Sequence, residues 1–242
     1  MDQQTKAALK RDQFIDTTQH GLEWASENRH AVIVTSVVAL VVLVIAIVAG
    51  VVYSSRSSAA TQLFGQAMQE YQTPLADPGL PVPPGTKTYA STADRAKAAN
   101  RIFMEAADKY GMIPEGKLAR YFGGLTYMEA GENSQAETEL KQVADGWNHN
   151  VAALAKFALA DLYRRTGRES EAIALYNDLT AKPASTVPAG LAQLQLAELY
   201  EAQGKPDEAK RVYAQLKDKD AKGAAGMIAA QKLNPSATPA AR

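Results

Sequence analysis

Cysteine is absent from the 242-residue sequence, which excludes disulfide bonds, thiol catalysis, cysteine-ligated zinc and a lipidated N-terminal cysteine. An excess of charge of either sign is also absent. The 26 basic and 26 acidic residues balance, so the composition gives no electrostatic indication of a nucleic-acid partner.

Catalytic motifs are missing as well. The sequence has no H-E-x-x-H, no Walker loop, no G-x-S-x-G and no G-x-G-x-x-G, and its three histidines are scattered. Asp218 and Asp220, in KDKDAK, lack the converging ligands that a hard cation needs, so we interpret them as a solvated helix junction. We therefore expect a protein that is not an enzyme and that uses no metal or cofactor.

An uncharged apolar run is the strongest feature that is present. Residues 31–52 read AVIVTSVVALVVLVIAIVAGVV, and about 20 apolar residues in a helix suffice to cross a bilayer. The run therefore predicts a transmembrane helix. A buried strand is an alternative, but strands are typically about 4–8 residues long. A signal peptide cleaved near Ser58-Ala59-Ala60 is another, but its apolar region is typically about 7–15 residues long.

Basic residues predict the orientation of this span. Four basic residues precede the span: Lys6, Lys10, Arg11 and Arg29. Within the twenty residues that follow it, Arg56 is the single basic residue. Because positive flanks stay in the cytoplasm, we expect residues 1–30 to form a cytoplasmic tail and the remainder to lie outside. Trp24 and Tyr53 flank the run and are predicted to lie at the two membrane interfaces.

Proline divides the next part of the chain. Residues 57–71 have helical spacing, with Leu63, Ala67 and Tyr71 on one face. Residues 72–91 then contain five prolines, which block a helix, so an extended insertion is predicted there. A proline-rich ligand motif is the alternative interpretation.

Three copies of one pattern follow. Each has a tyrosine, at 127, 163 and 200, preceded three residues earlier by a small residue and followed four residues later by glycine. An alanine (136, 172, 209) and a Leu or Tyr (140, 176, 213) come next. The small residue lets two antiparallel helices approach closely, and the glycine ends the first helix. Such hairpins bury their apolar faces by stacking into a solenoid.

This pattern resembles tetratricopeptide repeats, whose period is about 34 residues, over residues 116–220. An earlier repeat would pair residues 57–71 with a helix that carries Ala99, Phe103 and Ala106, and residues 221–233 would form a capping helix. The predicted fold is all-α: a transmembrane helix followed by an α-solenoid of tetratricopeptide-like hairpins over residues 53–233, with the insertion at 72–91 and a disordered tail at 234–242.

The layout also resembles the single-span tetratricopeptide-repeat proteins of bacteria that include the ancillary subunit of the Sec translocon. The resemblance is carried by a short tail with Phe14, Trp24 and Asn28-Arg29, one anchor, a degenerate first repeat and then regular repeats. It implies a single-pass protein of the inner membrane, with the N-terminus cytoplasmic and the C-terminal domain periplasmic. It further implies translocon subunits, chaperones or exported polypeptides as partners, with no nucleic acid and no small-molecule substrate.

In such solenoids the first helix of each hairpin lines the binding face. Transferring that rule by spacing predicts a partner-binding groove made of Leu118, Tyr121, Leu125, Met128, Leu154, Phe157, Asp161, Arg164, Leu191, Leu194, Glu198 and Glu201. The alternative is that the apolar members are core. The predicted function is a membrane-anchored interaction module that assists translocation or chaperone hand-off. Alternatives are a scaffold for an envelope or cell-division complex, and a regulatory subunit of a membrane enzyme.

Overall fold

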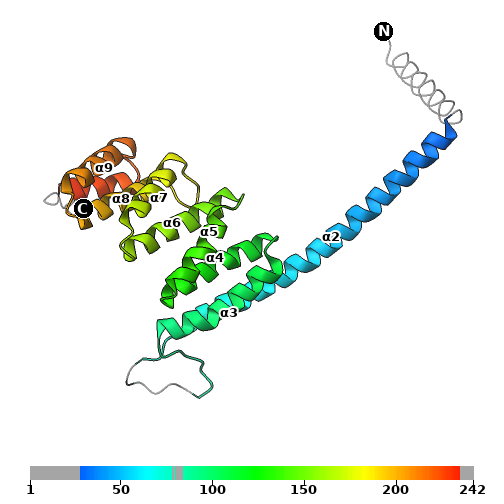
Figure 1. The fold of residues 1–242 in the computed structure, drawn as a ribbon, viewed down its shortest axis with the longest axis horizontal. Helices are drawn as coiled ribbons and strands as arrows, with labels where there is room; N and C mark the ends of the chain where they lie inside the picture. The colour runs from blue at the N-terminus through cyan, green and yellow to red at the C-terminus, as the bar shows by residue number, and fades with distance from the viewer. Residues whose placement is uncertain (1–27, 78, 80–83, 235–242) are drawn as a thin grey trace, which may run out of the picture. The chain divides into compact units, whose positions relative to one another are not determined.

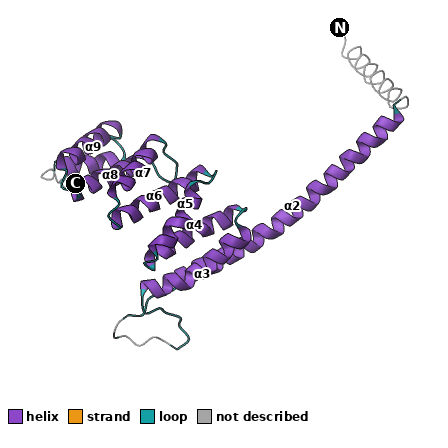
Figure 2. Ribbon diagram, in the orientation of Figure 1, coloured by secondary structure: helices purple, strands orange, loops and turns teal. Residues whose placement is uncertain are grey.

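The computed structural model describes residues 28–77, 79 and 84–234, and the regular elements in that part of the chain are helices (Figures 1 and 2). The helices in chain order are α2 (Arg29–Tyr71), α3 (Thr92–Tyr110), α4 (Pro114–Glu129), α5 (Asn133–Ala144), α6 (His149–Arg165), α7 (Glu169–Ala181), α8 (Ala189–Ala202), α9 (Pro206–Lys219) and α10 (Ala224–Leu233). The chain divides into two compact units, Met1–Ser55 and Arg56–Arg242. The predicted all-α fold is thus confirmed.

The described part of the first unit is the N-terminal portion of α2. Its Val, Ile and Leu side chains are exposed on every side of the helix. It is the one helix among the described residues that is long and apolar enough to cross a bilayer. The helix does not end where the apolar run ends. Residues 53–71 contain no proline and a single glycine, so nothing in the backbone interrupts α2 before Tyr71.

The second unit begins with a hairpin made by the C-terminal part of α2 and by α3. Phe64 of α2 lies against Phe103 of α3, with ring centroids 5.7 Å apart. Phe103 in turn stacks on Phe122 of α4 at 5.4 Å. Ala67, Ala99 and Phe103 are buried in this cluster. The prediction of a degenerate first repeat, with its two helices far apart in sequence, is confirmed by this packing.

Residues 72–91 connect these two helices, and both ends of the connection are paired. The amide of Tyr89 donates to the carbonyl of Pro74 (3.1 Å), and the amide of Ala76 donates to the carbonyl of Tyr89 (2.8 Å). Lys87 forms an ion pair with Glu70 of α2 at 2.5 Å. Residues 78 and 80–83 lie outside the described part of the chain.

Three regular hairpins follow: α4–α5, α6–α7 and α8–α9, each packed on its neighbours. Gly131, Gly167 and Gly204 end the first helix of each hairpin with φ between 70° and 80°, a left-handed conformation that favours glycine. In each turn the next amide donates back into the first helix, for example from Glu132 to the carbonyl of Tyr127 at 2.8 Å. The predicted role of the three glycines is therefore confirmed.

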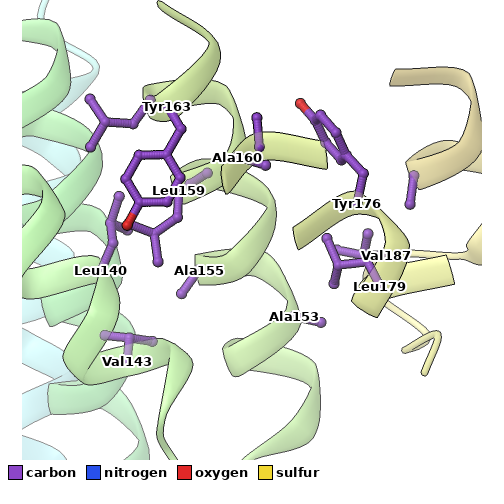
Figure 3. Close-up of a cluster of buried hydrophobic side chains, with 14 of the residues drawn as sticks. Leu140, Val143, Ala153, Ala155, Leu159, Ala160, Tyr163, Tyr176, Leu179 and Val187 are labelled. Atoms are coloured by element: carbon purple, nitrogen blue, oxygen red, sulfur yellow. The ribbon is translucent and has the colours of Figure 1, made fainter. Parts of the chain in front are cut away.

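The small residues of the repeat lie where the two helices of a hairpin meet. Ala136, Ala172 and Ala209 are buried, as are Leu140, Tyr176 and Tyr213 one turn later. Figure 3 shows how Tyr163 and Leu159 of α6 lie beside Leu140 of the preceding hairpin, while the ring of Tyr176 points toward the part of α6 that carries Ala160, away from Leu179 and Val187. Those of the first two hairpins form one continuous core that passes from hairpin to hairpin, as expected for stacked repeats. Ala209 and Tyr213 of the third hairpin lie in a separate cluster with Leu194.

Helix α10 is placed like the first helix of a further hairpin. The turn that precedes it repeats the α3–α4 turn: Gly223 donates to the carbonyl of Asp220 (2.9 Å) as Ile113 does to that of Tyr110 (2.8 Å). A glycine follows three residues after each donor: Gly116 after Ile113 and Gly226 after Gly223. A Cβ atom on Gly116 would overlap the carbonyl of Tyr110, and one on Gly226 would overlap the carbonyl of Asp220. Within the predicted capping segment 221–233, α10 therefore packs as half a repeat.

Candidate functional site

The first helices of successive hairpins are neighbours. Helix α4 contacts α6, and α8 contacts α10. Arg164 of α6 is electrostatically coupled to Glu198 of α8. We use the term first-helix face for the surface formed by the twelve groove residues predicted on α4, α6 and α8.

The apolar members of the first-helix face differ in exposure. Leu191 is 38% exposed, whereas Met128 and Leu194 are only 8% exposed. The remaining ones are half-buried: Leu118, Tyr121, Leu125, Leu154 and Phe157. Four of these five also pack against the continuous core, so they contribute to folding as well as to the surface. Contact of these residues with a partner stays a prediction.

The two aromatic residues of the face are fixed by neighbouring rings. Tyr121 contacts Phe122 edge-on at 5.4 Å, and Phe157 contacts Tyr176 edge-on at 5.9 Å. Burial raises the pKa of the Tyr121 phenol, which keeps it neutral at physiological pH. Rigid, half-buried aromatic rings lose little conformational entropy when a partner covers them, which favours their use as anchors.

The charged members of the face are paired. Asp161 accepts from Arg164 (2.7 Å) and faces Arg165 (3.6 Å). Glu198 accepts from the amide of Gln195 at 2.8 Å. Glu201 faces Lys232 of α10 at 3.3 Å. The three acidic members of the face outnumber its one basic member, but Arg165 and Lys232 beside the face bring the count to three groups of each sign, which weakens the field toward an anionic or a cationic ligand.

A hollow of about 640 Å³ lies at the C-terminal end of the face, lined by residues of α8, α9 and α10 and by Thr180 of α7. Leu191 and Leu194 are on its wall, and Ile228 of α10, 42% exposed, is also part of the lining. Sequence reasoning missed Ile228. The signal that could have revealed it is the glycine spacing shared by the turns before α4 and α10, which aligns Ile228 with Leu118.

The other predicted positions are placed as follows. Tyr53 lies on α2 with its ring exposed, and Trp24 lies outside the described residues. Whether either lies at a membrane interface stays a prediction. Within residues 28–77, 79 and 84–234, no three His, Asp or Glu side chains gather as metal ligands would.

Comparison with known proteins relates this arrangement to others. Residues 23–235 match the tetratricopeptide repeat-like domain. Two crystal structures of nearly identical TPR-like repeats, from a Podosopora anserina chain described as a kinesin light chain, have a similar fold; one carries a single substitution. Each is 17% identical, covers 73% of this chain and 84% of that chain, and gives a TM-score of 0.53.

No curated protein matches the sequence. The likeness to the two crystal structures concerns the fold alone, because their sequence identity is low. The match to the domain family, in contrast, extends over most of the sequence and includes every helix described above. The chain belongs to the tetratricopeptide repeat-like domain family.

Proposed function

We propose that the chain is a non-enzymatic protein-interaction module, anchored by residues 31–52 in the bacterial inner membrane with the repeat unit on the periplasmic side. The first-helix face would bind segments of exported polypeptides beside the Sec translocon and pass them to chaperones. The anchor is supported by the length of α2 and by the exposed apolar side chains of its N-terminal portion. The orientation is supported by the basic residues before the span.

The observation that carries the binding proposal is the hollow at the end of the first-helix face. Leu191 and Ile228, on opposite helices, leave about two fifths of their surface exposed around it. Concave apolar sites of this size bury apolar side chains of a ligand. The half-buried rings of Tyr121 and Phe157 extend the apolar surface along the neighbouring first helices.

The balance of charge indicates which polypeptides fit. Asp161 and Glu201 are ion-paired within the unit, and Glu198 accepts a hydrogen bond from the neutral side-chain amide of Gln195, so most of the charge on the face is compensated internally. A face that is apolar and electrostatically neutral suits chains in which large apolar residues are exposed, which is the condition of a polypeptide before it folds.

Site-specific photo-crosslinking in native membranes tests this proposal. A photoreactive amino acid would replace Leu191, Ile228 or Tyr121, and mass spectrometry would identify the products. Gln215, exposed on the second helix α9, is the matched control position. We expect translocon subunits, chaperones and several exported chains from the three test positions, and few products from the control.

Other outcomes would change the assignment. One dominant envelope protein, captured from all three test positions, would indicate a scaffold with a fixed partner. Equal yields from the test positions and from Gln215 would refute the first-helix face as the binding site. Leu191→Lys and Ile228→Lys place charges in the hollow at half-exposed positions, so they should reduce capture at Tyr121 without unfolding the repeats.

A further inference from the structure

One edge of the repeat unit carries exposed or half-buried apolar and basic side chains that neither the core nor the first-helix face uses. The edge is formed by the loops between successive hairpins, at the beginning of α4 and of α6. We use the term loop edge for five residues there, Lys109, Tyr110, Met112, Lys117 and Trp147, together with Arg56 of α2, which contacts two of them. Met112 is 94% exposed and Trp147 is 77% exposed, which is unusual for large apolar side chains.

These residues form one surface. The guanidinium of Arg56 donates to the carbonyl of Lys109 at 3.0 Å and lies 5.9 Å from the centre of the Tyr110 ring. The ammonium of Lys117 lies 4.5 Å from the Trp147 ring. A cavity of about 110 Å³ is lined by Gly111 and Lys117 from one loop region and by Gly146 from the other, so the two loops are adjacent.

Chain connectivity holds this edge near a membrane. Arg56 follows Val52, the last residue of the apolar run, by four residues. Four residues span about 6 Å in a helix and at most about 14 Å when fully extended. Arg56 must therefore stay close to the end of the span, and Lys109 and Tyr110 stay with Arg56 through the contacts described above.

The opposite edge of the hairpins has a different composition. The turns within the three regular hairpins read GEN, GRE and GKP, without a large apolar residue. The two loops of the loop edge read YGMI and DGWN. Tryptophan and tyrosine are enriched at the level of lipid head groups, where an aromatic ring is half desolvated and its polar atom stays hydrated.

Charge on the loop edge also suits lipid phosphates. Arg56, Lys109 and Lys117 are opposed by Glu115 and Asp145 near the same loops, which leaves a small positive excess. Asp108 does not reverse it, because Asp108 is paired with Arg120 at 2.9 Å. Basic groups near an anionic lipid surface are attracted to it. The aromatic and apolar side chains add the burial that a purely electrostatic contact lacks.

We propose that the loop edge rests in the head-group layer of the bilayer, with Met112 and Trp147 inserted among the head groups and the basic residues beside phosphates. This inference rests on the membrane anchoring proposed above and goes beyond it. It names a second, peripheral contact with lipid, made by residues outside the span. Docking at this edge would also limit which directions the first-helix face can point.

Fluorescence quenching of Trp147 in the full chain tests the proposal. The sequence contains two tryptophans, so Trp24→Phe leaves Trp147 as the sole emitter. The variant is reconstituted in phosphatidylcholine–phosphatidylglycerol vesicles that contain increasing amounts of lipid with a nitroxide on the head group. Both leaflets carry the quencher, so the direction of insertion does not matter. We expect Trp147 to be quenched several-fold more strongly than a tryptophan on the opposite edge.

The matched control is Trp24→Phe, Trp147→Phe, Gln135→Trp, which moves the emitter to an exposed residue near the turn between α4 and α5. Met112→Glu, at a side chain almost free of intramolecular contact, should reduce the quenching of Trp147 and leave the circular dichroism unchanged. Quenching of Trp147 that merely equals that of the control would overturn the docking. Release of the chain from the vesicles by alkaline carbonate would overturn the anchoring, and the docking with it.

Discussion

The same substitution, glycine to alanine, should have opposite effects at two helical positions of the repeat unit. Gly65 lies on an exposed side of α2, and a Cβ atom added there would meet nothing within 4 Å. Gly124 lies on α4 against the second helix of its hairpin. A Cβ atom added at 124 would come within 2.6 Å of Cγ of Leu140, a side chain that is fully buried.

The magnitudes follow from two effects. Replacing glycine by alanine in a helix interior stabilises it by about 0.5–1 kcal/mol, and this gain applies at both positions. Overpacking a closely packed contact costs about 1–3 kcal/mol, and this cost applies only at Gly124. We therefore expect Gly65→Ala to raise the free energy of unfolding by about 1 kcal/mol and Gly124→Ala to lower it by about 1 kcal/mol.

Urea unfolding of the full chain in detergent micelles, followed by far-UV circular dichroism, measures both values. The comparison is valid where the free energy of unfolding falls with urea concentration at the same slope in every variant, because a shift in the midpoint then reports a change in stability. Leu140→Ala provides the control because it removes the side chain that the new Cβ would strike. In that background Gly124→Ala should become stabilising, which would give a positive coupling energy between the two sites. If Gly65→Ala and Gly124→Ala raised the free energy of unfolding equally in the wild-type background, the close approach of α4 and α5 would be refuted.

The contact at Gly124 shows why the repeats could be predicted from sequence. A hairpin of two helices needs a small residue where the helices cross and a left-handed residue where they turn. Both requirements recur at fixed spacing, as at Gly124 and Gly131, and equivalent small residues and glycines stand in the other hairpins. Local requirements of this kind are recorded in the sequence itself.

The extent of α2 was harder to predict because the apolar run and the helix end at different residues. Hydrophobicity falls after Val52, whereas the backbone meets no helix-breaking residue until the prolines that follow Tyr71. The apolar run therefore describes a span but not the end of a helix. The pairing of Leu75 with Tyr89 at the base of the insertion joins residues far apart in sequence, so no local pattern predicts it.

Exposure on the first-helix face could not be predicted because it depends on neighbouring helices. Leu191 and Leu194 are one turn apart on α8 and equally apolar, yet only Leu194 is buried among residues of the following helices. Ile228 lines the same hollow because the turn before α10 positions that helix as half a repeat. The spacing rule selected the helices that form the face but not the side chains that remain accessible.

Three further substitutions test the packing and the charges. Asn100→Ala removes a buried side-chain amide that donates to a main-chain carbonyl at 2.9 Å. Urea unfolding should show that the free energy of unfolding falls by about 1–3 kcal/mol, and a fall as small as that for an exposed residue would contradict this. Gly226→Ala forces a Cβ atom onto the carbonyl of Asp220, so amide hydrogen exchange in α10 should accelerate, and unchanged exchange would argue against the half-repeat placement. Glu137→Gln should destabilise the protein at neutral pH only. Hydrogen bonds from Arg168 and from a neighbouring lysine hold the pKa of Glu137 at about 2, against an ordinary value of 4.5. The folded state therefore favours the charged carboxylate, and its contribution to stability is complete above the unfolded pKa and disappears as pH falls from 4.5 toward 2. A pKa difference of this size corresponds to at most about 3 kcal/mol, and solvent screening of the partly exposed pair reduces it to about 1–2 kcal/mol. Urea midpoints of the variant and the wild type should differ at about pH 7 and converge near the folded pKa, and a difference that persists there would show that the ion pair is not its cause.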